Sequence, residues 1–243
     1  MNEGSYSTEY RDHVDLTYNA RLKKYIAQGL KCFPWIGKDY ASAAVKVLVV
    51  AETHYGINST EIEYYNNNID ATQRTIWSSR IARQWENKTT RNLDRVLAGS
   101  ERVDNTQCLW EHLAYYNIVQ RIMPTRKDKP STSDFMLGWE LFPHIIKEIT
   151  PDVCLFCGVN AADTFDEKMH EMQINYIPVC RNREEHICPR SAFMDVGDSR
   201  LRLIFIHHCG NPYFSWHMYH AYLKKELPHT MSFLAELSSS KVQ

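Results

Sequence analysis

The most informative stretch of the sequence is KVLVVAETHYG, residues 46–56. Residues 47–51 are apolar and mostly β-branched, which is typical of a strand buried on both faces. Residues 52–56 become polar and end at a glycine, which is typical of a turn. Because strands buried on both faces occur mainly in parallel sheets covered by helices, we expect further strands of this kind.

Three similar apolar runs and one shorter run supply those strands. They cover residues 114–119, 152–157 and 201–206, with the shorter run at 175–179. Apolar spacing predicts helices at residues 11–30, 74–98, 106–113, 133–149, 160–172 and 216–227. The alternation of strands and helices predicts an α/β fold, in which helices cover both faces of a mainly parallel sheet.

Two segments show no clear period. Residues 57–73, rich in Asn, Thr and Tyr, are predicted to be a loop that could act as a lid, and residues 181–200 a charged, irregular segment. Within the expected helices, we predict an interruption near Asn87 and a kink or break at Pro143.

Length and composition restrict the class of protein. The chain has 243 residues, 44% hydrophobic and 23% charged, with a formal net charge of −1. This balance is that of a globular protein and excludes a disordered chain. We expect a single domain over residues 1–243, with residues 1–44 as an N-terminal helical extension. No apolar run approaches the ~18 residues of a membrane span, and no signal-peptide pattern is present, so we expect a cytoplasmic protein without a membrane partner.

The cysteines favour a reduced protein. They stand at positions 32, 108, 154, 157, 180, 188 and 209. An odd number without a secretory signal indicates free thiols. Cys154 and Cys157 form a CxxC in an apolar run, which favours core packing over a metal pair. Cys180 and Cys188 leave a zinc site as an alternative, but no second pair at suitable spacing accompanies them. We therefore expect no metal.

Polar clusters follow three of the predicted strands. They are residues 52–56, Asn117 and residues 207–211. Sites in open α/β sheets form outside the carboxyl ends of the strands. We therefore expect the fold to bring these clusters, which are scattered along the chain, together at one edge.

Each cluster has a chemical and a structural interpretation. Glu52 could position water or act as a general base, or it could cap a turn. The neighbouring His54 and Tyr55 could line a ligand or fill that turn. Asn117 presents a donor and an acceptor that complement a nucleobase edge, or it pairs with nearby backbone.

His207 and His208 are candidates for stabilising a developing negative charge. Strand alternation sends the two side chains to opposite sides, so we expect only one of them to act. The structural alternative is that both are packing residues.

A local basic patch lies in the loop of residues 121–130. Its basic residues are Arg121, Arg126, Lys127 and Lys129, against a single acid, Asp128. Because the whole chain is nearly neutral, any face that binds nucleic acid would have to be basic locally. This loop is the candidate DNA contact.

The order of these motifs resembles the uracil-DNA glycosylase superfamily. The resemblance covers about residues 45–225 and rests on four stretches, VLVVAETHYG, LWEHLAYYNIVQRIMP, FPHIIKEITPDVCLFCGVNAADTF and LIFIHHCGNPYF. It implies a three-layer α/β/α sandwich around a short, mainly parallel sheet. The implied activity is hydrolysis of the N-glycosidic bond of uracil or a related damaged base that is flipped out of DNA.

The resemblance also implies roles for residues. Glu52 would position or activate water, and His207 or His208 would stabilise charge on the departing base. Asn117 would read the pyrimidine edge, and Pro212 and Tyr213 would begin a loop that presses on the DNA. The implied substrate-binding set is Thr53, His54, Tyr55, Asn117, Asn211 and Tyr213.

The sequence also departs from the family pattern. Thr53 replaces the catalytic Asp of one family, His54 the motif Pro, and Ala51 the opening Gly, while Cys209 and Gly210 stand where Pro-Ser is expected. The cysteines do not match the iron–sulfur members, so no cofactor is expected. An alternative is therefore a relative that binds a nucleobase or nucleotide without excision. A third possibility is a metal-dependent hydrolase using Glu52, His54, His207 and His208, although no HxH or HExxH spacing favours it.

Overall fold

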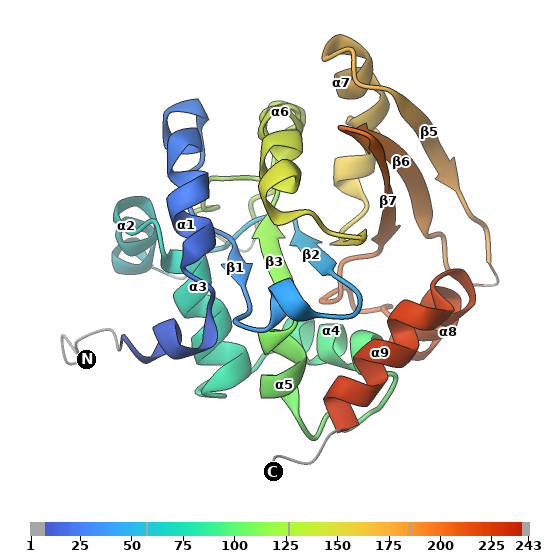
Figure 1. The fold of residues 1–243 in the computed structure, drawn as a ribbon, viewed down its shortest axis with the longest axis horizontal. Helices are drawn as coiled ribbons and strands as arrows, with labels where there is room; N and C mark the ends of the chain where they lie inside the picture. The colour runs from blue at the N-terminus through green and yellow to red at the C-terminus, as the bar shows by residue number, and fades with distance from the viewer. Residues whose placement is uncertain (1–7, 57, 126, 185, 240–243) are drawn as a thin grey trace.

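A computed structural model describes residues 8–56, 58–125, 127–184 and 186–239. Within these residues, one sheet contains seven strands in the order β1-β3-β2-β4-β7-β6-β5 (Figure 1). The strands are β1 (Trp35–Ile36), β2 (Val47–Ala51), β3 (Ala114–Asn117), β4 (Val153–Cys157), β5 (Tyr176–Arg181), β6 (Arg190–Val196) and β7 (Ser199–Ile206). The predicted α/β class is confirmed.

Helices surround this sheet. The α-helices are α1 (Thr17–Leu22), α2 (Ser59–Asn67), α3 (Ala71–Ile76), α4 (Lys88–Ala98), α5 (Thr106–Glu111), α6 (Thr132–Ile149), α7 (Phe165–Glu171), α8 (Trp216–Glu226) and α9 (Pro228–Ser239). Short 3₁₀ turns occur at η1 (Glu9–His13), η2 (Lys23–Gln28), η3 (Tyr40–Ser42) and η5 (Asn160–Asp163), and a π-helical turn at η4 (Trp77–Ile81). In the part of the chain that the structure describes, none of the helices combines the length and the apolar character that a membrane crossing requires.

The sheet is mixed, so the expectation of a short, mainly parallel sheet is wrong. Strands β3, β2, β4 and β7 run parallel to one another, whereas β1, β6 and β5 pair antiparallel with their neighbours. Strand β6 lies in the segment 181–200 that was expected to be irregular. Its buried residues, Ala192 and Met194, alternate with more exposed ones, so it lacks the continuous apolar run of a central strand.

The structure also corrects other predictions about the helices. The segment 57–73, of which the structure describes residues 58–73, is not a loop but carries all of α2 and the start of α3. No residue of α2 is buried, so its sequence had no apolar face to reveal it. The expected helix 11–30 is divided among η1, α1 and η2, and the N-terminal 1–44 segment also contributes β1 to the sheet.

Strand β5 forms one edge of the sheet. Pro178 has no N–H to donate, and the N–H of Val179 is bonded to Oδ1 of Asp166 in α7 at 3.0 Å. The pairing of β5 with β6 is also irregular between Ile177 and Cys180. At these two positions the edge therefore offers no free N–H group.

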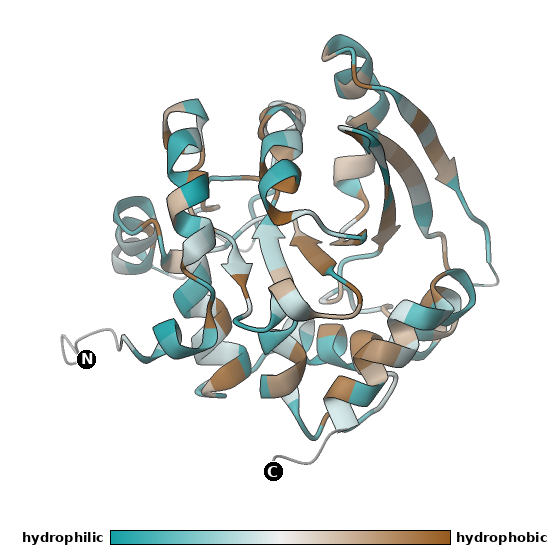
Figure 2. Ribbon diagram, viewed as in Figure 1, coloured by the Kyte–Doolittle hydropathy of each residue, from teal (hydrophilic) through white to brown (hydrophobic). Residues whose placement is uncertain are grey.

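Hydrophobic cores lie on both faces of the sheet. One contains side chains of α1, α6 and α7, and the other those of α4, α5, α8 and α9. Figure 2 shows β2 as an apolar strand in the middle of the fold, whereas α2 is largely hydrophilic. In the first core Trp139 is fully buried, packs edge-on against Phe165 at 5.1 Å, and donates from Nε1 to the carbonyl of Ala161 at 2.8 Å.

We predict that Gly138→Ala destabilises the protein although alanine favours helices. A Cβ at Gly138 in α6 would overlap the backbone carbonyl of Ile118 and lie 2.7 Å from its Cγ1. The helix-propensity gain is about 1 kcal/mol, while overpacking of this kind costs about 1–3 kcal/mol or more. Urea unfolding should show a net loss of stability.

The matched control is Gly197→Asn, at a positive φ of 61° with open space around the Cβ position. Asparagine tolerates this conformation, so its stability should stay within about 0.5 kcal/mol of the parent. An unchanged midpoint for Gly138→Ala would show that α6 does not need this close approach.

Candidate functional site

The sheet register aligns the strand ends that carry the predicted polar clusters. Ala51 at the end of β2 pairs with Asn117 on one side and Cys157 on the other, and Cys157 pairs with Ile206. The carboxyl ends of β3, β2, β4 and β7 therefore lie in one row. The residues that follow them share one edge of the sheet.

Glu52, which follows β2, carries the most unusual group at this edge. Its side chain is buried, with the residue only 8% exposed, and Oε1 has no hydrogen-bond partner among the described residues. Burial raises the pKa of this carboxyl. Hydrogen bonding from the backbone and side chain of Asn160 and the positive charge of Lys129 act in the opposite direction, but burial is the larger effect. A carboxylate whose pKa is raised is a stronger base than an ordinary carboxylate, so ionised Glu52 is suited to accept a proton.

Gly158 makes room for that carboxylate. It follows β4, has a positive φ of 145°, and donates its N–H to the carbonyl of Ile206 at 2.9 Å. A Cβ at this position would lie 2.6 Å from Cγ and Cδ of Glu52. The side chain of Glu52 thus lies directly on the backbone of the neighbouring strand end.

Backbone bonds join the loops that follow β2 and β3. Val119 donates to the carbonyl of Glu52 at 2.9 Å, and Met123 to that of His54 at 2.8 Å. The hydroxyl of Thr53 donates to the carbonyl of Arg121 at 2.6 Å, so it holds the two loops together. Burial, together with the negative charge of the nearby Glu52, raises the pKa of Tyr55.

Asn117 is already paired within the protein. Its Nδ2 lies 2.6 Å from Nε2 of His54, and its Oδ1 accepts from the Tyr115 hydroxyl at 3.2 Å. Thr72 also contacts His54 Nε2 at 2.9 Å, and the ring of Tyr65 lies 4.5 Å from the imidazole. Burial lowers the pKa of His54 to about 3, which keeps its ring neutral. Both ends of the Asn117 amide are therefore engaged.

The two histidines after β7 have different surroundings. Nδ1 of His208 accepts the backbone N–H of Gly210 at 3.1 Å, and burial lowers its pKa. The neutral ring therefore carries its proton on Nε2, where it can be donated. His207 lies edge-on to Tyr219 at 6.0 Å, and burial, with the charge of Arg190, lowers its pKa.

The turn after these histidines presents an aromatic ring to solvent. Oδ1 of Asn211 accepts from the N–H of Tyr213 at 2.9 Å. Lys88 in α4 donates to the carbonyls of Asn211 and Pro212 at 3.0 and 3.3 Å. Tyr213 is 95% exposed at the tip of this braced turn.

Only part of the predicted basic patch is free. Arg121 makes a bidentate pair with Asp134 at 2.5 and 2.6 Å, and this guanidinium lowers the Asp134 pKa to about 2. Arg126 lies outside the described residues. Lys127 and Lys129 are exposed, and Lys129 lies close enough to Glu52 to lower its pKa.

The predicted site residues thus share an edge but form separate groups. In residues 8–239, outside the three internal gaps, no hydrogen bond or ion pair joins Glu52 to Asn117 or His208. Sequence reasoning missed Asn160, which lies beside Glu52, and Thr72, which lies beside His54. Thr72 had no signal, because it fell in a segment assigned as loop.

The thiols and the search for metal ligands give a simpler result. Cys154 and Cys157 are buried in β4, while Cys180 and Cys188 are exposed and free. No three His, Cys, Asp or Glu side chains are grouped as metal ligands in the described part of the chain.

Comparison with known proteins adds no family assignment. Neither the protein-family models nor the curated proteins gave a match to the chain. The chemistry that this edge can carry out must therefore be argued from its own groups. They are a buried carboxylate with an unpaired oxygen, a neutral imidazole donor and an exposed aromatic ring.

We predict that Gly158→Ala lowers stability by about 2–4 kcal/mol, because the new methyl group displaces Glu52 and the positive φ is strained. Adding Glu52→Ala should restore part of this loss, because it removes the overlapping atoms. A double-mutant cycle measured by urea unfolding tests the contact. Strict additivity would contradict it.

A second prediction concerns pH. The raised pKa of Glu52 means that its ionisation opposes folding, so its contribution to stability falls as pH rises above the ordinary value of 4.5. Glu52→Gln should therefore be as stable as the parent, or more stable, at pH 7. The advantage should shrink as pH falls towards 4.5.

Glu111 is the matched control, because it is also buried but bonded to His13 and Gln107. Although burial opposes ionisation, these bonds and Lys38 leave the pKa of Glu111 below its ordinary value of 4.5. Ionised Glu111 therefore stabilises the fold above pH 4.5, and this contribution is lost as the pH falls through the lowered pKa. Glu111→Gln should cost about 1–3 kcal/mol at pH 7 and less in acid. Equal losses for both variants at pH 7, measured by urea unfolding, would contradict the difference.

Proposed function

We propose that the protein is an N-glycosyl hydrolase that excises uracil or a related damaged base from DNA, with a uracil-DNA glycosylase-like fold. The single observation that carries this proposal is the buried Glu52, whose Oε1 is unpaired among the described residues. Leaving a buried charged acceptor unpaired is costly, about 1–3 kcal/mol or more. Such a cost is typical of a group kept for chemistry.

In the proposed reaction Glu52 accepts a proton from water as the water attacks the sugar carbon of the glycosidic bond. The bond to the base breaks, and its electron pair leaves with the base. The Nε2–H of His208 donates a hydrogen bond to the charge that develops on the departing base. Neutral His208 suits this role, because its Nδ1 accepts the N–H of Gly210 and its single ring proton is therefore on Nε2.

The DNA would be held by exposed groups near the same edge. Tyr213 offers a ring that can stack or press against a strand whose base has been flipped out. Lys127 and Lys129 supply the local positive charge, while Arg121 is neutralised by Asp134. This leaves a small basic surface on a chain of net charge −1.

One observation favours the alternative, a relative that binds a nucleobase or nucleotide without excision. The amide of Asn117 is engaged by His54 and Tyr115, so a pyrimidine edge can be read only if it replaces one of them. An amide whose hydrogen bonds are already made by neighbouring side chains discriminates less strongly for a flipped base than a free amide does.

An excision assay tests the proposal. Single- and double-stranded DNA with one uracil is incubated with the protein, and alkali then cleaves at abasic sites. Glu52→Gln should lower the rate by about 10²–10⁴-fold, since it removes the base that accepts the proton. Glu111→Gln, if folded, should keep the parent rate.

The outcomes separate the two functions. Cleavage by the parent protein that is lost only in Glu52→Gln supports excision. Folded protein without cleavage of uracil or of a panel of damaged bases, but with saturable binding of a pyrimidine nucleotide, supports the alternative. Equal cleavage by parent and Glu52→Gln contradicts the role of Glu52.

A further inference from the structure

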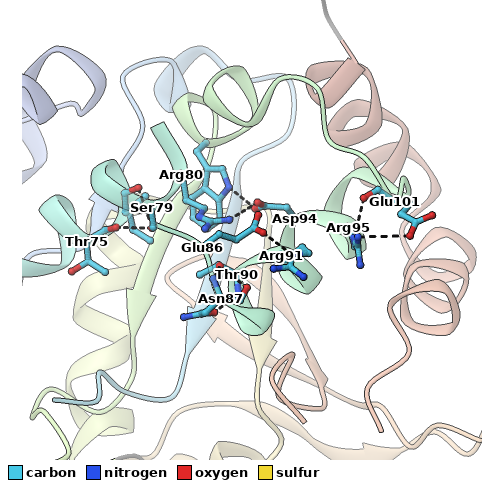
Figure 3. A network of polar contacts seen from close by, with 12 residues as sticks. Thr75, Ser79, Arg80, Glu86, Asn87, Thr90, Arg91, Asp94, Arg95 and Glu101 are labelled. Carbon is cyan, nitrogen blue, oxygen red and sulfur yellow. Dashed lines mark hydrogen bonds and ion pairs between the residues drawn. The ribbon is translucent and has the colours of Figure 1, made fainter. Parts of the chain in front are cut away.

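A second feature of the molecule lies away from the sheet edge, between η4, the start of α4 and α5. Here a cavity of about 170 Å³ is lined by polar side chains, among them Arg80, Arg83 and Thr106. Figure 3 shows Arg80 beside Asp94, with Glu86 next to them. None of these residues belongs to the proposed reaction.

Arg80 is the unusual member of this group. It is only 2% exposed, and its Nη1 donates to Asp94 at 2.5 Å. Asp94 also accepts from Trp110 at 2.8 Å, so its carboxylate is fully engaged. Nε and Nη2 of Arg80, by contrast, are buried and have no partner among the described residues.

The two unpaired nitrogens form one edge of the guanidinium. Nε–H and an N–H of Nη2 point the same way and are spaced to bond two oxygens of one carboxylate or phosphate group. An unpaired buried donor costs about 1–3 kcal/mol, and more when charged. Because Arg80 also lines the cavity, an oxyanion bound there could supply the partner that these two nitrogens lack.

The other walls suit an anion. Arg83 adds a positive charge without an ion pair among the described residues, while Glu86 is already paired with Arg91 at 2.6 Å. The backbone is also unusual here. Arg83 has a positive φ of 49° and stands two residues after the end of the π-helical turn η4. Turns of this kind are frequent at functional sites.

Trp85 forms a further wall and provides a reporter. Its indole N–H donates to the Ser78 hydroxyl at 3.1 Å, which holds the ring in place, and the residue is partly exposed. An anion bound beside this ring would change its fluorescence.

We propose that this cavity binds a small oxyanion, a carboxylate or phosphate group, whose two oxygens accept from Nε and Nη2 of Arg80. Arg83 supplies a second positive charge on the wall of the cavity. The site is independent of base excision. The cavity is large enough for a compact group, so the ligand is a small molecule or one end of a larger one.

Binding is tested with inorganic phosphate and with acetate at constant ionic strength, chloride being the control ion. We expect a saturable change in tryptophan fluorescence and a matching rise in the thermal midpoint for at least one of the two anions. Trp85→Phe should remove the fluorescence change but keep the rise in midpoint. Phosphate and acetate then distinguish the two sources of the oxyanion.

Arg80→Lys keeps the charge but loses the two-pronged edge, so it should weaken binding about tenfold or more. Because Arg80 is buried, this variant could fail to fold. Arg83→Asn, at an exposed position whose positive φ asparagine tolerates, should then weaken binding about threefold or more.

Two results would overturn the proposal. One is the absence of any saturable response to both anions up to about 50 mM, which corresponds to negligible affinity. The other is a saturable response that is unchanged in Arg83→Asn and in every folded Arg80 variant, since the anion would then lie elsewhere.

Discussion

Parallel pairing of β2 with a strand on each side is the constraint on which the rest of the structure depends. It puts the ends of β3, β2 and β4 in one row, and β7 extends that row. The loops that follow can then bond to each other through their backbones. Glu52 occupies the middle of the row, where its carboxylate lies against Gly158 rather than in water. Burial of this acid is thus a result of strand order.

Among the buried polar atoms without a hydrogen-bond partner in the described residues are Oε1 of Glu52 and the Nε and Nη2 atoms of Arg80, which belong to groups of opposite charge. They lie in different places, Glu52 at the carboxyl edge of the sheet and Arg80 within η4. The fold therefore does not let them neutralise each other. In the two proposals made above, each would meet an external partner, a water molecule or substrate at Glu52 and an anion at Arg80.

The sequence predicted those parts of the fold that a local pattern encodes. Strands β2, β4 and β7 were recognisable because buried central strands are continuously apolar. Strand β6 and helix α2 were not, because one alternates in burial and the other buries no residue. The position of the polar clusters at strand ends followed from the rule for open α/β sheets, but their partners did not. The pairing of Asn117 with His54, for instance, also involves Thr72, from a segment without periodicity, and a buried arginine such as Arg80 has no sequence signature at all.

The interrupted row of donors on the edge strand β5 affects how this protein can meet other chains. An extended peptide docks on a sheet by bonding to free N–H groups of its outermost strand. Pro178 has none, and the N–H of Val179 is taken by Asp166. The opposite edge, β1, is only two residues long. Both edges therefore carry features that disfavour strand addition, an interrupted row of donors on β5 and a very short strand at β1, and such features are common protections against edge-to-edge aggregation.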